Sequence, residues 1–252
     1  MSAWARKRQS MIVLYVVLLL LLGATIGYFS FVYKPPGCFD GIKNGLEEGV
    51  DCGGGCQLVC SFRAANPNNA WSRAFEIAPG LYNFAAAVEN PNFAVGANVD
   101  YVFRAYNAEN VQIAEVFGTE TLHPTERTVV FQSAVDTGER RIARVFFDFI
   151  EPTAWYKTPP ITKTVISQSY ELEDVTTRPK LQASLFNTSS KVVRDLIVTA
   201  VLYDEEENIT QVSQTYVEQI EADSQAIAFF TWRIPFENNI QNVEIFISEP
   251  QQ

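Results

Sequence analysis

Histidine and cysteine are scarce in this chain of 252 residues. Its one histidine, His123, stands before Pro124 in an expected surface turn, and no cysteine occurs after Cys60. Without a second histidine, a G-x-S-x-G turn or a glycine-rich phosphate loop, the sequence lacks the parts for nucleophilic catalysis and phosphoryl transfer. A glycosidase needs only two carboxylates, but no pair among the 29 acidic residues stands out beside sugar-stacking aromatics. We therefore expect a protein that is not an enzyme.

Positive charge is also in short supply. Lysine and arginine number 19 against 29 aspartate and glutamate residues, and the formal net charge is −10. No run of basic residues with interleaved aromatics occurs, and an acidic surface repels a polyanion at long range. Nucleic acid is therefore excluded as the expected partner.

Long apolar runs are limited to Met11–Tyr33, 23 residues without a charged side chain. As a helix this run would be about 34 Å long, enough to cross a hydrocarbon core of about 30 Å. Arg6, Lys7 and Arg8 precede it, and mostly acidic residues follow it, so the positive-inside rule predicts a cytoplasmic N-terminus and extracytoplasmic C-terminal domains. A cleaved signal peptide is the alternative, but the run exceeds a usual h-region and no small-x-small cleavage site follows it.

All four cysteines, Cys38, Cys52, Cys56 and Cys60, fall within 23 residues. An even number outside the membrane predicts two disulfides, because so short and polar a segment buries too little apolar surface to order itself. Three pairings are possible; the flexible Gly53-Gly54-Gly55 favours Cys38–Cys56 with Cys52–Cys60, but the spacing does not decide. Zinc or an iron–sulfur cluster is the alternative use of four thiolates, although the C-x3-C-x3-C run lacks the usual C-x2-C.

Acidic residues in the same segment partly match a calcium-binding loop. With Asp40 at position 1 of an EF-hand loop, Asn44 takes position 5, Glu48 position 9 and Asp51 position 12. Ile42 at position 3 offers no side-chain oxygen, and no flanking helices are evident. The alternative is a turn-rich, disulfide-linked segment whose Asp and Asn side chains cap their own backbone.

Residues 38–56 read CFDGIKNGLEEGVDCGGGC. This string resembles a short motif, DGIxNGxExxVDCGGxC, of surface and secreted proteins in many microbes and some eukaryotes. The resemblance implies a small extracellular module that often stands beside β-rich domains. It implies no catalysis and no particular ligand.

From Trp71 onward, apolar and polar residues alternate with a period of two, and no long helical period competes. The segments rich in β-branched and aromatic residues are 99–106, 128–135, 144–150, 196–203 and 243–248. Turn signals such as those at 107–110 and 204–208 separate them at short intervals, as in an all-β sandwich.

The chain also repeats itself at an offset of about 97 residues. Ala87-Val-Glu-Asn-Pro recurs as Ser184-Leu-Phe-Asn-Thr, and residues 101–110 recur as residues 198–208. One Ig-like sandwich has about 100 residues, so we expect two tandem domains. The proline-containing stretch 151–160 is too short for a free spacer and is expected to hold them at a restricted angle.

Residues 180–248 resemble the FxLYD-type β-sandwich of bacterial and archaeal envelope proteins, because Leu202-Tyr203-Asp204 precedes an acidic turn. The first repeat has Ala105-Tyr106-Asn107 instead. The resemblance implies the fold and is silent on function. The expected fold class is thus all-β, with two tandem Ig-like β-sandwiches behind one transmembrane helix and a short disulfide-rich segment. Its expected parts are a basic cytoplasmic tail (1–10), the transmembrane helix (11–33), the Cys-rich segment (34–62), sandwich 1 (63–154) and sandwich 2 (155–252).

Trp71, Trp155 and Trp232 could form a carbohydrate platform, although packing in the cores or at the domain junction is the stronger interpretation. Asn187 and Asn208 each begin a glycosylation sequon. Both also fall in turns where an unmodified asparagine is expected.

These features predict a non-enzymatic, single-pass cell-membrane protein that presents two sandwiches outside the cell to an unknown protein or cell-envelope partner. An accessory subunit of a membrane secretion or transport complex is the alternative, because Gly23 and Gly27 have the spacing of a helix-dimer motif. If the sandwiches stack end on, the distal one is expected to carry the contact surface. The candidate binding residues there are Asp204, Glu205, Glu206, Glu207 and the segment 236–239, with solvated hairpin turns as the alternative.

Overall fold

The structure, a computed structural model, describes residues 3–33 and 35–249, without the side chains of residues 3–7, 32 and 152. The predicted orientation of the helix rests in part on Arg6, Lys7 and Lys34, whose side chains lie outside the described residues. The chain divides into two compact units, residues 1–56 and residues 57–252.

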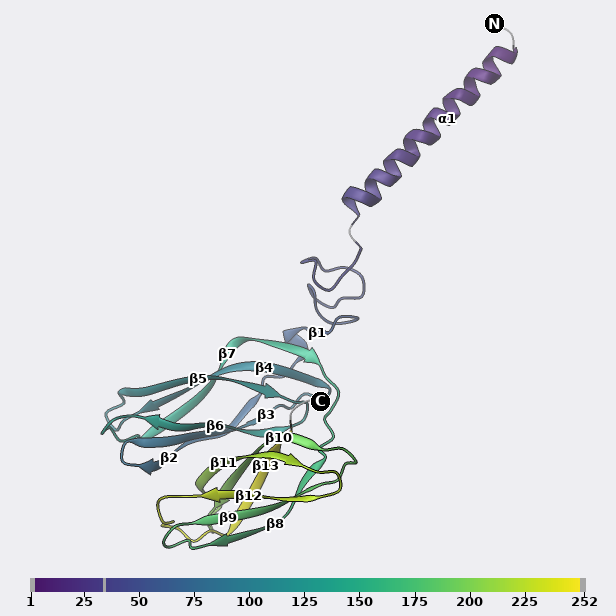
Figure 1. Ribbon diagram of the computed structural model, residues 1–252. Helices are drawn as coiled ribbons and strands as arrows, with labels where there is room; N and C mark the ends of the chain where they lie inside the picture. Colours follow the sequence, from purple (N-terminus) through teal and green to yellow (C-terminus); the bar gives the residue numbers. More distant parts are fainter. Residues whose placement is uncertain (1–2, 34, 250–252) are drawn as a thin grey trace. The chain divides into compact units, whose positions relative to one another are not determined.

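The first unit begins with α1 (Ala3–Gly27), which continues as one π-helical turn, η1 (Tyr28–Val32) (Figure 1). Within it, Arg8–Phe31 has a mean hydropathy of 2.5 and none of its most apolar window is buried in the protein. A helix that is apolar on all sides and exposed on all sides suits a lipid environment. The predicted apolar helix is therefore present, and its length and composition fit a membrane anchor or a signal sequence.

The second unit consists of antiparallel strands, which confirms the all-β prediction (Figure 1). We call β1–β7 the first strand set and β8–β13 the second strand set. The first set comprises β1 (Leu58–Val59), β2 (Asn68–Ala78), β3 (Leu81–Glu89), β4 (Val95–Tyr106), β5 (Gln112–Leu122), β6 (Arg127–Asp136) and β7 (Arg144–Lys157), with a 3-10 turn, η2 (Ser61–Arg63), after β1. The second set comprises β8 (Val165–Glu173), β9 (Lys180–Asn187), β10 (Val193–Tyr203), β11 (Ile209–Ile220), β12 (Gln225–Thr231) and β13 (Asn242–Ser248).

Each strand set forms two sheets with matching strand order. The first set has sheets β2-β3-β6 and β1-β7-β4-β5, and the second set has sheets β8-β9-β12 and β13-β10-β11. Side chains from the two sheets of a set meet in an apolar core, which contains Phe84 and Phe103 in the first set and Leu196 and Phe230 in the second. Each set therefore has an apolar core of its own, without a contribution from the cysteines.

A third apolar cluster joins the two strand sets. Phe75, Ala85 and Val129 of sheet β2-β3-β6 pack with Val201 and Val212 of sheet β13-β10-β11. The strands β3 and β10 are therefore buried on both faces, which explains their nearly continuous apolar sequences. The strand sets therefore do not stack end on, the condition attached to the expected distal contact surface, because the outward apolar side chains of β3 and β10 are buried by sheet-on-sheet packing.

Ion pairs surround this third cluster. The guanidinium of Arg127 lies 3.7 Å from Oε1 of Glu244 and 5.7 Å from the ring centroid of Phe246. Nζ of Lys163, in the segment between β7 and β8, lies 2.8 Å from Oε1 of Glu126. The connecting segment is thus tied to the first strand set by an ion pair.

Residues 57–62, predicted to belong to the Cys-rich segment, lie within the β unit. Leu58 and Val59 form β1, which pairs with Tyr156 and Trp155 of β7. The expected Cys-rich segment therefore ends inside a sheet of the first strand set.

The tryptophans of the β unit pack in the cores or at the junction between the strand sets, which was favoured over a carbohydrate platform. Trp155 is 2% exposed in the first core, and Trp232 is 8% exposed in the second. Trp71 is half-buried against the cluster between the strand sets.

Asn187, at the end of β9, is a polar side chain that is fully buried. The two hydrogens of its Nδ2 are shared among the carbonyl oxygens of Lys191 (2.7 Å), Ile220 (3.1 Å) and Glu221 (3.0 Å). Its Oδ1 accepts from the backbone N–H of Ser189 at 2.9 Å. The side chain links the β9–β10 turn to the β11–β12 turn, so this sequon asparagine is a structural residue.

Asn90 occupies the equivalent place after β3, 97 residues earlier, and is also buried. Its Nδ2 donates to the carbonyl oxygens of Val95 (2.8 Å) and His123 (3.0 Å). It therefore links the β3–β4 turn to the β5–β6 turn, as Asn187 does in the second set. Asn208, in the other sequon, is exposed in the β10–β11 turn.

We expect Asn187→Ala to lower the free energy of unfolding by about 3 kcal/mol, because buried carbonyl and N–H groups lose their partner. Asn208→Ala is the matched control at the exposed sequon, and its effect should stay below about 1 kcal/mol. Urea unfolding midpoints measure both changes. Equal losses in the two variants would show that Asn187 does not hold the turns together.

Candidate functional site

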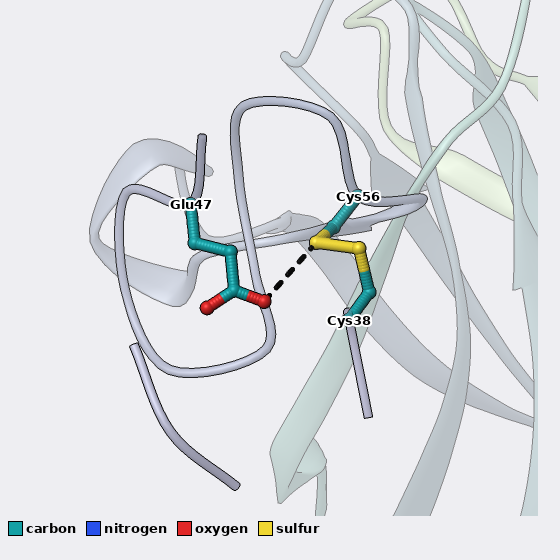
Figure 2. A group of neighbouring side chains, drawn as sticks. All are labelled: Cys38, Glu47 and Cys56. Atoms are coloured by element: carbon teal, nitrogen blue, oxygen red, sulfur yellow. Dashed lines mark hydrogen bonds between the residues drawn. A yellow bond between two sulfur atoms is a disulfide. The ribbon is translucent and has the colours of Figure 1, made fainter. Parts of the chain in front are cut away.

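The Cys-rich segment contains a disulfide between Cys38 and Cys56, with an S–S distance of 2.04 Å (Figure 2). This bond belongs to the favoured one of the three predicted pairings. Cys52 and Cys60 are also in disulfide form, and none of the described cysteines is free. Zinc and iron–sulfur clusters bind thiolates, so this oxidised state does not suit either.

Glu47 lies beside the Cys38–Cys56 disulfide (Figure 2). Its Oε1 approaches Sγ of Cys56 at 3.6 Å, and its Oε2 accepts the backbone N–H of Asn44 at 3.1 Å. A disulfide sulfur has no hydrogen to donate, so the first contact is a close approach and not a hydrogen bond. Among the described residues, these two sulfurs and Glu47 form the one cluster with metal-binding spacing, and the disulfide occupies the sulfurs.

Two of the predicted calcium ligands, Asp40 and Asp51, cap neighbouring turns. Oδ1 of Asp51 accepts the backbone N–H groups of Asp40 (2.9 Å) and Gly41 (3.1 Å). Oδ1 of Asp40 accepts the N–H of Ile42 (2.9 Å), and its Oδ2 accepts from Nδ2 of Asn44 (2.7 Å). This is the geometry of the self-capping alternative, while calcium binding stays a prediction.

Glu48, the remaining predicted calcium ligand, is exposed and packs against Gly53. The next residue, Gly54, has φ of +53°, and a Cβ there would overlap the carbonyl oxygen of Leu46. Glycine is required at this close approach of two backbone segments. The triple glycine therefore fixes the loop that ends at Cys56, which is a role more specific than flexibility.

His123 lies between β5 and β6, half-buried and not fully at the surface. Burial lowers the pKa of its imidazole; Glu126 acts in the opposite direction, and Lys163 adds to the lowering. The Glu126–Lys163 ion pair belongs to the junction between the strand sets. We assign His123 to this junction and give it no chemical role.

Asp204 begins the predicted binding turn between β10 and β11. Its Oδ1 accepts the backbone N–H groups of Glu206 (3.0 Å) and Asn208 (2.9 Å). Desolvation acts to raise the pKa of Asp204, but these hydrogen bonds outweigh it and lower the pKa. Asp204 therefore holds the turn, and the exposed Glu205, Glu206 and Glu207 extend from it.

The two segments predicted as binding sites form one surface. Nδ2 of Asn238 donates to Oδ2 of Asp204 at 3.3 Å, and Nδ2 of Asn239 donates to Oε1 of Glu205 at 3.0 Å. The β12–β13 loop and the acidic turn are thus joined by direct hydrogen bonds.

A groove of about 480 Å³ lies beside this surface and has walls from both strand sets. The first set contributes Phe75 and Glu76 of β2, and the second set contributes Asp204, Phe236 and Glu237. Every charged residue among those described in the lining is acidic. We call this hollow the acidic groove. The sequence analysis did not identify Phe75 and Glu76 of β2 as groove residues, because their position in the groove depends on the face-to-face packing of the strand sets.

Tyr203 directly precedes Asp204 and packs against the cluster between the strand sets. Its hydroxyl donates to Oε2 of Glu244 at 2.9 Å. Burial, this hydrogen bond and the negative charge of Glu244 raise the pKa of Tyr203 to about 12, although Arg127 acts in the opposite direction. The phenol therefore keeps its proton at neutral pH and links β10 to β13.

Amide hydrogen exchange of residues 38–56 in the full-length protein tests the calcium prediction against the capped-turn geometry. Because Asp51 already accepts backbone N–H groups, we expect Asp51→Ala to speed exchange at Asp40 and Gly41 whether calcium or chelator is present. The exposed Glu48→Gln is the control and should change neither amide. Protection that rises with millimolar calcium and disappears in both variants would instead establish the calcium loop.

No known family profile and no curated protein matches this chain. Among solved structures, the crystal structure of red sea bream transglutaminase is similar over 71% of this chain and 29% of that chain. The identity is 10% and the TM-score is 0.27. The chain thus spans less than a third of that protein, and a likeness of this extent assigns neither a fold family nor an activity.

Proposed function

We propose that this protein is a non-enzymatic, single-pass membrane protein that binds a partner outside the cell through the acidic groove. The observation that carries the proposal is the groove itself, whose described charged residues are all acidic and whose walls come from both strand sets. Loops on a rigid β scaffold commonly carry recognition. Here the β12–β13 loop and the acidic turn, residues 204–208, are held in place by hydrogen bonds to one another.

The proposed location rests on the helix and the disulfides. An exposed apolar helix of this length fits an uncleaved anchor. Disulfides persist in oxidising compartments, which supports placing the Cys-rich segment and the strand sets outside the cell membrane. The basic residues before the helix support a cytoplasmic N-terminus.

We infer that the two strand sets are tandem Ig-like sandwiches related by an internal repeat. Their matching strand orders support this, as do the equivalent turn residues Asn90 and Asn187. The resemblance of residues 180–248 to FxLYD-type sandwiches fits the same inference and adds no activity.

One turn residue adds support for recognition by the acidic turn. Glu207 has φ of +62°, and Asn110, its equivalent in the first set, has φ of +60°. Asparagine adopts this left-handed conformation readily, whereas most other residues are disfavoured there by roughly 1–2 kcal/mol. A glutamate at this disfavoured backbone position is consistent with a carboxylate that serves binding.

The partner we infer is a basic segment of a protein. Glu76, Asp204 and Glu237 line the groove, and Glu205 and Glu207 stand beside it. Complementary charge speeds encounter and weakens as salt is added. Phe75 and Phe236 provide apolar contact within the same groove.

A second candidate function is an accessory subunit of a membrane complex, such as a secretion or transport assembly. A Cβ added at Gly23 or at Gly27 would meet no atom within 4 Å, so this face of α1 is open to another helix. Small residues four apart allow two helices to approach closely in a membrane.

The location is tested by adding protease to intact spheroplasts. We expect cleavage of the strand sets and survival of a fragment of about the first 35 residues, because the bilayer shields the helix. Immunoblots against the two ends of the chain measure the result. Survival of the C-terminal strand sets in intact spheroplasts would place them in the cytoplasm and overturn the proposed topology.

Binding by the groove is tested with Glu205→Gln combined with Glu207→Asn, which removes two charges and leaves the cap by Asp204 in place. We expect at least a tenfold loss in proximity labelling of the partner in intact cells, and a loss of the salt dependence of its capture. Glu109→Gln combined with Glu139→Gln is the matched control, because it removes two exposed charges away from the groove. Equal labelling by the two double variants would rule out the groove as the binding surface.

A further inference from the structure

The outer face of sheet β8-β9-β12 carries exposed apolar side chains. Ile227 and Phe229 of β12 are 51% and 59% exposed, and Ile166 of β8 is 46% exposed. Ile166 pairs with Phe186 of β9, which is half-buried. We call these four residues the open face. Contiguous exposed apolar side chains on a soluble domain commonly mark an interaction surface.

The same face of the first strand set is not exposed. The strand pairing shows which residues of the two sets are equivalent. Ala87 of β3 pairs with Val129 of β6, just as Ser184 of β9 pairs with Ile227 of β12. In the same register, Ala85 pairs with Phe131 as Gln182 pairs with Phe229. Val129 and Phe131 are thus the counterparts of Ile227 and Phe229.

The counterparts in the first set are covered by another sheet face. Val129 and Phe131 belong to the cluster between the strand sets, where Val201 and Val212 pack against them. The internal packing therefore shows what covers this kind of face, namely the outward apolar side chains of another β-sheet.

The outer face of sheet β1-β7-β4-β5 also carries exposed apolar side chains, Phe117 and Phe146, but each shares a rung of the sheet with charged residues. Arg104, paired with Glu115 on β5, is the counterpart of Val201, which pairs with Val212 on β11. The Arg104 side chain forms ion pairs with Glu115 (2.8 Å) and Asp148 (3.0 Å). Head-to-tail stacking of two chains would bury this charged network against apolar side chains, which carries a large desolvation penalty.

We propose that two copies of this chain pack together through their open faces. Of the outward sheet faces described here, two are already in contact within the chain and one carries the Arg104 ion-pair network among its apolar side chains, so the apolar complement without ion pairs that a second copy offers is its own open face. Such a contact is isologous and closes after two copies, which matches the commonest symmetry of homo-oligomers.

Polar groups beside the open face do not oppose this contact. Nε2 of Gln225 donates to Oε1 of Gln168 at 2.6 Å, so these two side chains satisfy one another at the end near Phe186. At the other end, Glu171 pairs with Gln182 in the rung that contains Phe229, and places a carboxylate at the margin. Ile227 and Phe229 lie on β12, an edge strand of this sheet, beside Ser184 and Gln182 of the central strand β9.

Cysteine cross-linking of the full-length chain in native membranes tests the proposal. The introduced thiol of Ile227→Cys is expected to give a covalent dimer with a bifunctional maleimide. Phe117→Cys is the matched control, because Phe117 is 60% exposed on β5 and should give little dimer. Adding Phe229→Asp to Ile227→Cys is expected to lower the dimer fraction at least tenfold, since the isologous contact would bury two carboxylates.

Other results would overturn the open-face dimer. Equal dimer fractions from Ile227→Cys and Phe117→Cys would indicate random collision, and dimers unaffected by Phe229→Asp would point to pairing through α1. Cross-links from Ile227→Cys to a different protein, with no self-dimer, would assign the open face to a foreign partner. Phe229→Asp lies at an exposed position, and an unchanged thermal unfolding midpoint verifies that the variant is folded.

Discussion

The burial of two central strands on both of their faces is the constraint on which the β unit depends. One face of β3 and of β10 closes the core of its own strand set, and the other face closes the cluster between the sets. Small side chains such as Ala85 and Ala87 let the sheets approach closely. The acidic groove exists because of this contact, since β2 supplies one wall and the β10–β11 turn supplies another.

The sequence predicts the helix, the strands and the turns well, because each of these depends on residues close together in the chain. The uncharged run gives α1, period-two alternation gives the strands, and the repeat aligns the turn asparagines Asn90 and Asn187. The relative placement of the strand sets was missed. Its signal was present in β3 and β10, whose apolar residues occupy both faces, a pattern that a strand with one solvent face does not need.

The candidate site shows the same division between local and distant information. The acidic turn and the segment 236–239 were both predicted as candidate binding segments, because turn residues can be recognised from the sequence. Their hydrogen bonds to each other and the wall formed by Glu76 join residues far apart in the chain, which no local pattern encodes. In the Cys-rich segment, spacing suggested ligands, whereas the carboxylates of Asp40 and Asp51 also suit the backbone N–H groups that they accept.

The burial of Asn187 has a consequence for the order of events during biosynthesis. An oligosaccharide attached to its Nδ2 would occupy the place of three carbonyl partners and would not fit inside the closed turns. A secretory pathway that modifies sequons on the emerging chain would therefore compete with folding of the second strand set. Production in such a host would yield a glycosylated, misfolded fraction, whereas a pathway without that transferase would export one homogeneous form.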